Sequence, residues 1–191
     1  MAQAVSLTFI TGGVRSGKSS FAERTAIQLA ESMSGSLHYV ATGRVTDQEM
    51  AGRILRHQEE RQAGRYSWQT WEQPKEIGRL ASFFQKKDVL LLDCLTTLLS
   101  NELFNGAGDW ENESYQEKVK DHIMNGVIAL AKNCKELIIV SNELLFEPMD
   151  QKLVLLYAKL LAQLHIQIVK IAKRVYLVEA GIPLLMKGES L

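Results

Sequence analysis

The chain has 191 residues, 46% of them hydrophobic, which is enough to bury the core of one ordinary domain spanning residues 1–191. Lys+Arg and Asp+Glu both number 22, and this zero net charge argues against a general binder of nucleic acid or of membrane surfaces. The opening MAQAVSLTFITGG lacks the features of a secretory signal, and no apolar run approaches the roughly 20 residues of a membrane-spanning helix. We therefore expect a cytoplasmic protein whose two cysteines, Cys94 and Cys134, are reduced and packed.

Five short runs are almost continuously apolar, which is typical of strands covered on both faces in a parallel sheet. They lie at residues 5–11, 37–42, 88–94, 136–142 and 174–180. Segments with helical spacing of apolar residues lie between or beside them, at 18–33, 47–60, 113–133 and 149–173. The alternation predicts βαβ units and a P-loop NTPase-like, three-layer α/β/α fold with a mostly parallel sheet. The polar residues 57–79 and the turn-rich residues 105–114 are interpreted as excursions from this one domain.

Between the first strand and the first helix the chain reads GGVRSGKS, which matches the phosphate-binding pattern G-x-x-x-x-G-K-[ST]. The glycines let backbone N–H groups point at phosphate oxygens, and the positive end of the following helix adds to the attraction. Lys18 is expected to reach the β- and γ-phosphates, and the Ser19 hydroxyl to ligate Mg²⁺. The residues predicted to bind ATP or GTP here are Gly12, Gly13, Val14, Arg15, Ser16, Gly17, Lys18 and Ser19. The pattern predicts nucleotide binding and leaves the reaction open.

Two later strands end in polar residues at the edge where open α/β sheets bind ligands. Asp93 closes VLLLD and is predicted to stand beside the magnesium ion, the alternative being a cap on the next helix. Asn142 and Glu143 close LIIVSNE. Glu143 fits a base, a metal-shell group or a substrate contact, and equally a solvated turn carboxylate.

A second chemistry is indicated by residues 41–61, ATGRVTDQEMAGRILRHQEER. On a helix, Glu49, Arg53 and His57 share one face because they are spaced four residues apart. A neutral imidazole is a good nucleophile toward phosphorus, and Arg53 and Arg56 would stabilise phosphate charge. From these residues alone, a surface histidine in a charged helix is the simpler interpretation.

Together these segments resemble the family of bifunctional adenosylcobinamide kinase/adenosylcobinamide-phosphate guanylyltransferases. The matching stretches are collinear and span most of the chain: TGGVRSGKSSFAE, YVATGRVTDQEMAGRILRH, WQTWEQP, LLLDCLTTLLSNELF, IIVSNE and VYLVEAGIP. The phosphate-binding loop alone is unspecific. The loop followed by D-x-E-M, R-I-x-x-H and D-C-L-T-x-L-x-x-N is specific.

The resemblance implies two reactions of cobalamin biosynthesis. In the first, the γ-phosphate of a nucleoside triphosphate goes to the hydroxyl of the aminopropanol arm of adenosylcobinamide. In the second, a histidine, here His57, attacks the α-phosphate of GTP, expels pyrophosphate and passes GMP to the phosphorylated cobinamide, giving adenosyl-GDP-cobinamide. The resemblance also implies a catalytic role for Lys18, nucleotide binding by Glu72 of WQTWEQP, a corrinoid substrate, and a small homo-oligomer, typically a trimer.

The chain departs from the family pattern after residue 142. The family usually continues with V-G-x-G-I-V-P and then F-R-D-x-x-G-x-x-N-Q, whereas this chain reads NELLFEP, places residues 157–159 (YAK) at F-R-D and residues 165–166 (HI) at N-Q. The resulting apolar stripe predicts a helix that is buried or faces another subunit: Tyr157, Leu160, Leu161, Leu164 and Ile168. Two alternatives stay open, a small-molecule kinase without guanylyl transfer and a non-catalytic, nucleotide-binding regulatory protein.

Overall fold

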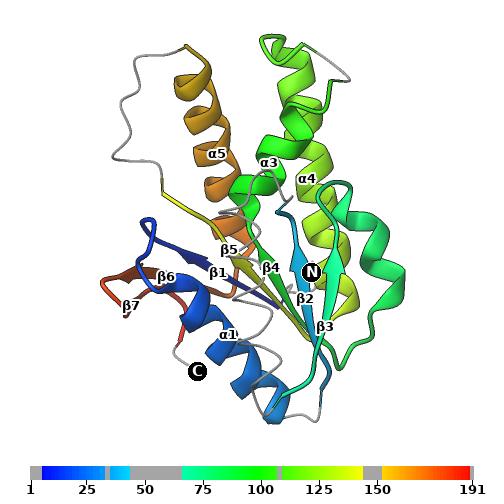
Figure 1. The fold of residues 1–191 in the computed structure, drawn as a ribbon, viewed down its shortest axis with the longest axis vertical. Helices are drawn as coiled ribbons and strands as arrows, with labels where there is room; N and C mark the ends of the chain where they lie inside the picture. The colour runs from blue at the N-terminus through cyan, green and yellow to red at the C-terminus, as the bar shows by residue number, and fades with distance from the viewer. Residues whose placement is uncertain (1–5, 33–34, 44–65, 107–108, 144–151, 190–191) are drawn as a thin grey trace, which may run out of the picture.

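The computed structural model describes residues 6–32, 35–43, 66–106, 109–143 and 152–189. They form a seven-stranded sheet with the strand order β3-β2-β4-β5-β1-β6-β7 (Figure 1). Every pairing is parallel except that of β7 with β6. The strands are β1 (Leu7–Thr11), β2 (Leu37–Ala41), β3 (Trp68–Glu72), β4 (Val89–Asp93), β5 (Glu136–Val140), β6 (Arg174–Glu179) and β7 (Ile182–Lys187).

Helices cover both faces of the sheet, so the predicted α/β fold with a mostly parallel sheet is confirmed. Among the described residues, α1 covers one face, and the remaining helices pack on the other (Figure 1). The helices are α1 (Lys18–Glu31), the 3₁₀ helix η1 (Ile77–Phe83), α3 (Leu95–Leu103), α4 (Glu113–Asn133) and α5 (Lys152–Ile171).

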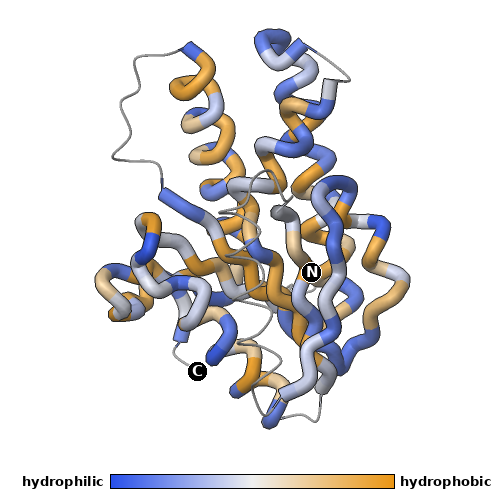
Figure 2. The backbone as a smooth tube through the Cα atoms, viewed as in Figure 1, coloured by the Kyte–Doolittle hydropathy of each residue, from blue (hydrophilic) through white to orange (hydrophobic). Residues whose placement is uncertain are grey.

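The central strands are buried on both faces because helices lie above and below them. All five residues of β1 and all five of β5 are buried. Phe9 belongs to the core under α3, α4 and α5, whereas its neighbour Ile10 belongs to the core under α1. Apolar chain therefore runs through the middle of the molecule, as Figure 2 shows, and this explains the unbroken hydrophobic runs in the sequence.

The edge strands are where the structure differs from the sequence-based expectation. Residues 68–72, interpreted as part of a polar excursion, form β3 at one edge of the sheet, and residues 182–187 add the antiparallel strand β7 at the other. Both strands keep exposed side chains because each has a neighbour on only one side, so neither shows an unbroken apolar run. The short helices η1 and α3 also lacked a sequence prediction, and the predicted helix 47–60 lies outside the described residues.

The helix that departs from the family pattern packs as the sequence predicts along one stripe. Leu160, Leu161, Leu164 and Ile168 of α5 are buried, and Tyr157 is partly buried against the same core. By length and composition α5 is also apolar enough to cross a membrane, which the inspection of apolar runs did not anticipate. One such helix is weak evidence for a membrane span, since helices of a protein core pass the same test.

Both cysteines are free thiols. Cys134 is buried, and burial is the main reason that its pKa rises to about 12. Burial, assisted by the adjacent Asp93 carboxylate, also raises the pKa of Cys94. Both thiols therefore stay protonated at neutral pH, which makes them poor nucleophiles and leaves them a packing role.

A buried ion pair ties three strands together at the amino-terminal edge of the sheet. The Arg174 guanidinium on β6 lies 3.1 Å from the Glu136 carboxylate on β5, and both side chains are almost fully buried. Glu136 also accepts hydrogen bonds from the hydroxyls of Ser6 and Thr8, and Thr8 accepts one from Arg174. Because β1 lies between β5 and β6, this network joins three adjacent strands of the sheet, β5, β1 and β6.

We expect Arg174→Met to lower the free energy of unfolding by about 3–5 kcal/mol, because it leaves the Glu136 carboxylate buried without its cation. Urea unfolding followed by circular dichroism measures this. Arg79→Met is the control, since Arg79 pairs with Glu76 at the surface and should cost about 1 kcal/mol or less. Equal effects of the two substitutions would contradict the assignment.

Candidate functional site: a phosphate-binding loop at the carboxyl edge of the sheet

The loop between β1 and α1 contains two glycines at which other parts of the backbone approach closely. A Cβ on Gly12 would lie 2.3 Å from the Val178 carbonyl oxygen, and a Cβ on Gly17 would lie 3.2 Å from Gly181 Cα. Gly17 also has φ +89°, in the left-handed region, at the N-cap of α1. The Gly181 N–H donates to the Ser16 carbonyl oxygen at 2.8 Å. The turn between β6 and β7 therefore packs against the loop and stabilises its backbone.

The side chains of the loop include a buried lysine and two buried hydroxyls. Lys18 is buried, and its Nζ donates to the Gly13 carbonyl oxygen at 2.9 Å, which folds the lysine back over the loop. The hydroxyls of Thr11 and Ser16 are buried and, within the described part of the chain, have no hydrogen-bond partner. Buried hydroxyls without partners are costly, and phosphate oxygens bound in the loop would satisfy them. Val14 and Arg15 are exposed at the tip, and Ser19 is partly buried in the first turn of α1.

Strand register brings two predicted carboxylates onto one face. Ala41 of β2 is the register partner of both Glu72 of β3 and Asp93 of β4. Register partners in parallel strands point to the same face, here the face covered by α1, two strand spacings or about 10 Å apart. The Asp93 carboxylate accepts a hydrogen bond from the Tyr39 hydroxyl at 2.9 Å, whereas Glu72 is exposed.

The alternative role for Asp93, a cap on the next helix, does not match the structure. The N-cap residue of α3 is Cys94, and no side chain caps this helix. Asp93 instead ends β4 on the same face as Tyr39. Tyr39 had no signal of its own in the sequence, because its partner lies 54 residues away.

Asn142 and Glu143, which follow β5, are held by hydrogen bonds from their backbone N–H groups. The Glu143 N–H donates to the Gly12 carbonyl oxygen at 3.1 Å, and the Asn142 N–H donates to the Thr96 hydroxyl at 3.0 Å. The start of this connection is therefore fixed between the phosphate-binding loop and α3. The several roles considered for the Glu143 side chain stay open.

Two residues of α5 at which the chain departs from the family pattern contact the chain just after β4 and β5. The Tyr157 hydroxyl donates to the Thr96 carbonyl oxygen, and His165 Nε2 lies 2.7 Å from the Ser141 hydroxyl. Burial lowers the pKa of His165 to about 4, so its imidazole is neutral at physiological pH. Sequence reasoning found only an apolar stripe here and missed this polar network, whose partners are far apart in the chain.

Three predicted residues, Arg53, Arg56 and His57, lie outside the described residues. Their segment follows Thr42 and Gly43, which leave β2 at its carboxyl end. This is also the edge that carries the phosphate-binding loop, because β1 and β2 are parallel members of one sheet.

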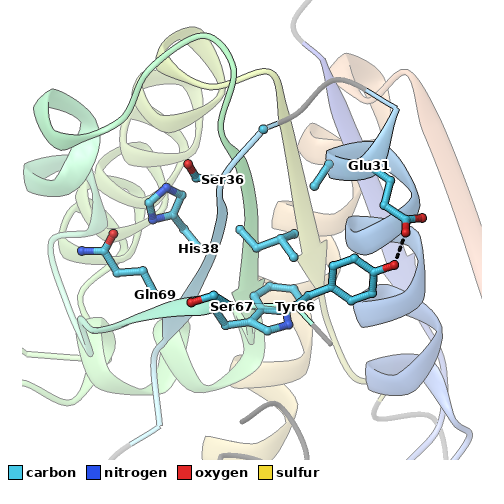
Figure 3. A pocket seen from close by; sticks show the side chains of 10 residues that line it. Glu31, Ser36, His38, Tyr66, Ser67 and Gln69 are labelled. Atoms are coloured by element: carbon cyan, nitrogen blue, oxygen red, sulfur yellow. Dashed lines mark hydrogen bonds between the residues drawn. The ribbon is translucent and has the colours of Figure 1, made fainter. Parts of the chain in front are cut away.

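A cavity of about 810 Å³ lies at the opposite edge of the sheet, between the end of α1 and the starts of β2 and β3. Figure 3 shows Tyr66 and Glu31 facing one another on one side of it, joined by a hydrogen bond. His38 lines another side and is held by Trp71, whose indole N–H donates to its Nδ1. None of the described residues that are predicted to bind nucleotide lines this cavity, so it is separate from the phosphate-binding loop.

A mostly parallel sheet with a glycine-built phosphate loop after β1, a buried lysine at the start of α1 and a carboxylate at the end of β4, two strands away, defines the class of P-loop nucleotide-binding proteins. Solved structures agree on the fold. The flagellar accessory protein FlaH from Methanocaldococcus jannaschii matches with a TM-score of 0.50 at 15% identity, covering 97% of this chain and 80% of that one. A solved ATPase domain matches with a TM-score of 0.53 at 11% identity, covering 91% of this chain and 69% of that one.

The family is narrower than the class. The family model described as cobinamide kinase / cobinamide phosphate guanyltransferase matches residues 8–186, so the chain belongs to this family. The bifunctional adenosylcobalamin biosynthesis protein CobP of Pseudomonas aeruginosa is 35% identical over 95% of this chain and 98% of its own length. The bifunctional adenosylcobalamin biosynthesis protein CobU of Escherichia coli is 28% identical over 95% of this chain and 99% of its own length.

We expect Lys18→Ala to raise the dissociation constants of ATP and GTP about tenfold or more, because a buried ammonium at the loop is lost. Equilibrium titration with a fluorescent nucleotide analogue measures this. Lys86→Ala is the control, since the Lys86 ammonium is bonded to the Lys132 carbonyl oxygen at the end of α4. Unchanged nucleotide affinity in Lys18→Ala would remove the loop from the site.

His165 predicts a dependence of stability on pH. Its pKa is about 4 in the folded chain and near 6.5 when exposed, so the unfolded state takes up a proton first as the pH falls. The stability that depends on neutral His165 is complete above about pH 6.5 and is lost toward pH 4, by on the order of 3 kcal/mol. Urea unfolding at several pH values should show a steeper loss for the wild type than for His165→Gln. A His122→Gln control, at an exposed histidine of α4, should keep the wild-type slope.

Proposed function

We propose that the chain catalyses both reactions of its family: phosphorylation of adenosylcobinamide by a nucleoside triphosphate, and transfer of GMP from GTP through His57 to give adenosyl-GDP-cobinamide. The observation that carries the proposal is the arrangement of the carboxyl edge. The phosphate-binding loop, the in-register carboxylates of Glu72 and Asp93, and Thr42 and Gly43, which precede the segment that contains His57, all lie at this one edge. The family match over residues 8–186 supports it.

In the kinase reaction, the loop N–H groups and the Lys18 ammonium hold the β- and γ-phosphates. The aminopropanol hydroxyl oxygen attacks the γ-phosphorus, and the bond from that phosphorus to the bridging oxygen of the diphosphate breaks. Phosphoryl transfer depends on positioning and charge neutralisation, which Lys18, the exposed Arg15 and the N-terminus of α1 supply. No residue needs to form a covalent bond in this step.

Mg²⁺ fits the groups at this edge. Hydroxyl and carboxylate oxygens are the ligands it prefers, and Ser19 at the start of α1 and Asp93 at the end of β4 would hold it. When bound, the ion neutralises charge on the phosphate oxygens. The Tyr39 hydroxyl occupies one Asp93 oxygen and so fixes the direction in which the carboxylate presents the other.

In the guanylyl transfer, the neutral imidazole of His57 attacks the α-phosphorus of GTP, an N–P bond forms, and the bond to pyrophosphate breaks. Arg53 and Arg56 offset the charge that develops on the phosphate. A phosphate oxygen of the phosphorylated cobinamide then attacks the same phosphorus and releases His57. Glu72, exposed on the face of Asp93, is available to contact the nucleotide.

The remaining parts of the proposal follow the sequence and the family. We infer a single nucleotide-binding domain over residues 1–191, since the family match covers nearly all of it. We further infer a cytoplasmic homo-oligomer, a trimer by analogy with the family, with nucleotide and corrinoid substrates and neither nucleic acid nor membrane as a partner. The zero net charge supports the last point.

One observation favours a kinase that lacks guanylyl transfer. Tyr157 stands at the phenylalanine position of the family pattern and His165 at its asparagine position, and they make internal hydrogen bonds to Thr96 and Ser141. Both side chains are thus bonded within the protein. Helix α5 therefore offers phosphorylated cobinamide fewer polar contacts than the family pattern would.

Radiolabelled GTP distinguishes the candidates. With label on the α-phosphate, we expect acid-labile, base-stable label on the wild type and none on His57→Ala, while His122→Ala, at an exposed histidine of α4, labels normally. With label on the γ-phosphate, we expect transfer to adenosylcobinamide by all three proteins.

Two other outcomes select the alternatives. Transfer of γ-phosphate without any α-label on the wild type would leave only the kinase. The absence of both, with nucleotide still bound, would leave a nucleotide-binding regulatory protein.

A further inference from the structure

The Asp93 carboxylate at the end of β4 is held by a phenol of the neighbouring strand. The Tyr39 hydroxyl on β2 donates to Asp93 Oδ2 at 2.9 Å. Tyr39 is the register partner of Leu91, two residues before Asp93, so the Tyr39 and Asp93 side chains are diagonal neighbours on the face covered by α1. The described residues place no other hydrogen bond on this carboxylate. Within the described part of the chain, one carboxylate oxygen is therefore engaged and the other, Oδ1, is not.

Tyr39 has little freedom to move its hydroxyl. Its side chain is buried in the core under α1. Its ring packs edge-on against Trp68, with the ring centroids 6.3 Å apart and an interplanar angle of 82°. Close packing of this kind holds a side chain in one rotamer. The donor to Asp93 therefore comes from one fixed direction.

The backbone that carries Asp93 is fixed as well. The Thr42 N–H donates to the Asp93 carbonyl oxygen at 3.1 Å. The Thr42 hydroxyl donates to the Cys94 carbonyl oxygen and accepts from the Cys94 N–H, both at 2.8 Å. Thr42 is fully buried, so water does not compete for these bonds. The position of the carboxylate is thus set by the strand end, and its orientation is set by Tyr39.

The metal site proposed above combines this carboxylate with Ser19, in the first turn of α1, the helix that packs on β4. Mg²⁺ demands octahedral coordination at about 2.0–2.1 Å and keeps several waters, so it needs a single oxygen from a carboxylate. Ca²⁺ takes about six to eight oxygens at about 2.3–2.6 Å and can use both oxygens of one carboxylate. An aspartate with one oxygen bonded to a buried phenol suits Mg²⁺ better than Ca²⁺.

We propose that Tyr39 is a positioning residue that limits Asp93 to one oxygen and so makes the site prefer Mg²⁺ to Ca²⁺. Without the phenol hydroxyl, the carboxylate can turn and offer both oxygens, which favours the larger ion. The inference rests on the proposed function, in which Ser19 and Asp93 hold the ion. It goes beyond that function by assigning the choice of ion to a side chain that binds neither ion nor nucleotide.

The test uses Tyr39→Phe, which keeps the packed ring and removes only the hydroxyl. The measurement is the dissociation constant of a fluorescent α,β-methylene analogue of GTP in EDTA, in Mg²⁺ and in Ca²⁺. His57 cannot cleave this analogue, and with no cobinamide present the γ-phosphate has no acceptor, so binding is measured without turnover. The ratio of the constant in EDTA to the constant in each ion gives the strengthening of nucleotide binding by that ion.

For the wild type we expect Mg²⁺ to strengthen nucleotide binding more than Ca²⁺ does. In Tyr39→Phe, the strengthening by Mg²⁺ should fall about tenfold, because a metal-binding carboxylate loses the hydrogen bond that orients it. The strengthening by Ca²⁺ should change by less than about threefold, because this ion can use the second oxygen. The constant in EDTA should stay within about twofold, since the loop that cradles the phosphates is unchanged.

Two further variants make the measurement specific. Tyr115→Phe is the matched control, because the Tyr115 hydroxyl is also hydrogen-bonded, but to the carbonyl oxygens of Glu102 and Leu103 at the end of α3. It should behave as the wild type in all three conditions. Asp93→Ala should lose most of the strengthening by both ions while its constant in EDTA is preserved.

Three results would overturn the inference alone. One is a wild type in which Ca²⁺ strengthens binding as much as Mg²⁺ does. Another is a Tyr39→Phe variant with the wild-type ratio of the two effects. The third is an equal weakening of binding by Tyr39→Phe in EDTA, Mg²⁺ and Ca²⁺, which is what a merely structural role predicts.

A different result would show that the metal site of the proposed function is wrong, and the inference would fall with it. This result is a wild type whose nucleotide binding neither ion strengthens, or an Asp93→Ala variant that keeps the full effect of both ions. The two failures are therefore distinguishable.

Discussion

The register of the parallel strands is the constraint on which the rest of the site depends. Ile10, Val140, Asp93, Ala41 and Glu72 form one continuous row of register partners across β1, β5, β4, β2 and β3. A shift of any one strand by a single residue would turn its side chains to the other face and carry a carboxylate away from α1. The buried network of Glu136 and Arg174 at the opposite edge helps to hold this register, since it joins β5 and β6 across β1.

The position of β6 beside β1 explains why the phosphate-binding loop needs its glycines. Because β6 lies beside β1, a Cβ on Gly12 would collide with the Val178 carbonyl oxygen of β6, and a Cβ on Gly17 would make a tight contact with Gly181 in the turn after β6. The loop therefore owes its shape to a neighbour near the other end of the chain as much as to its own sequence. The pattern G-x-x-x-x-G-K-[ST] predicts where the loop lies in the chain. The strand order determines that the loop packs against β6 and the turn after it.

The sequence could predict the parts of this protein whose signal is local. The buried strands β1, β2, β4, β5 and β6 were predicted because burial on both faces requires unbroken apolar runs. β3 and β7 were missed because edge strands have no such requirement. Within the site, the loop and Asp93 have local signals, whereas Tyr39 and Thr42 act through partners more than 25 residues away and look ordinary in the sequence. The role of His57 remains a prediction.

The two proposed reactions make different demands on the carboxyl edge of the sheet. In the kinase reaction a hydroxyl attacks the γ-phosphorus, and in guanylyl transfer a histidine attacks the α-phosphorus. One phosphate-binding loop must therefore hold the triphosphate so that two different nucleophiles can reach it. In the proposed mechanism the task is divided between strands: β1 and α1 would hold the phosphates, β4 would supply a carboxylate, and β2 and β3 precede the groups proposed for the second reaction. Helix α3 connects these parts of the site. It begins just after β4, and its side chains form hydrogen bonds with the backbone that follows β2 and β3. A chain with no net charge can support the proposed chemistry because two positive groups, Lys18 and the N-terminus of α1, lie together at the loop predicted to bind the phosphates.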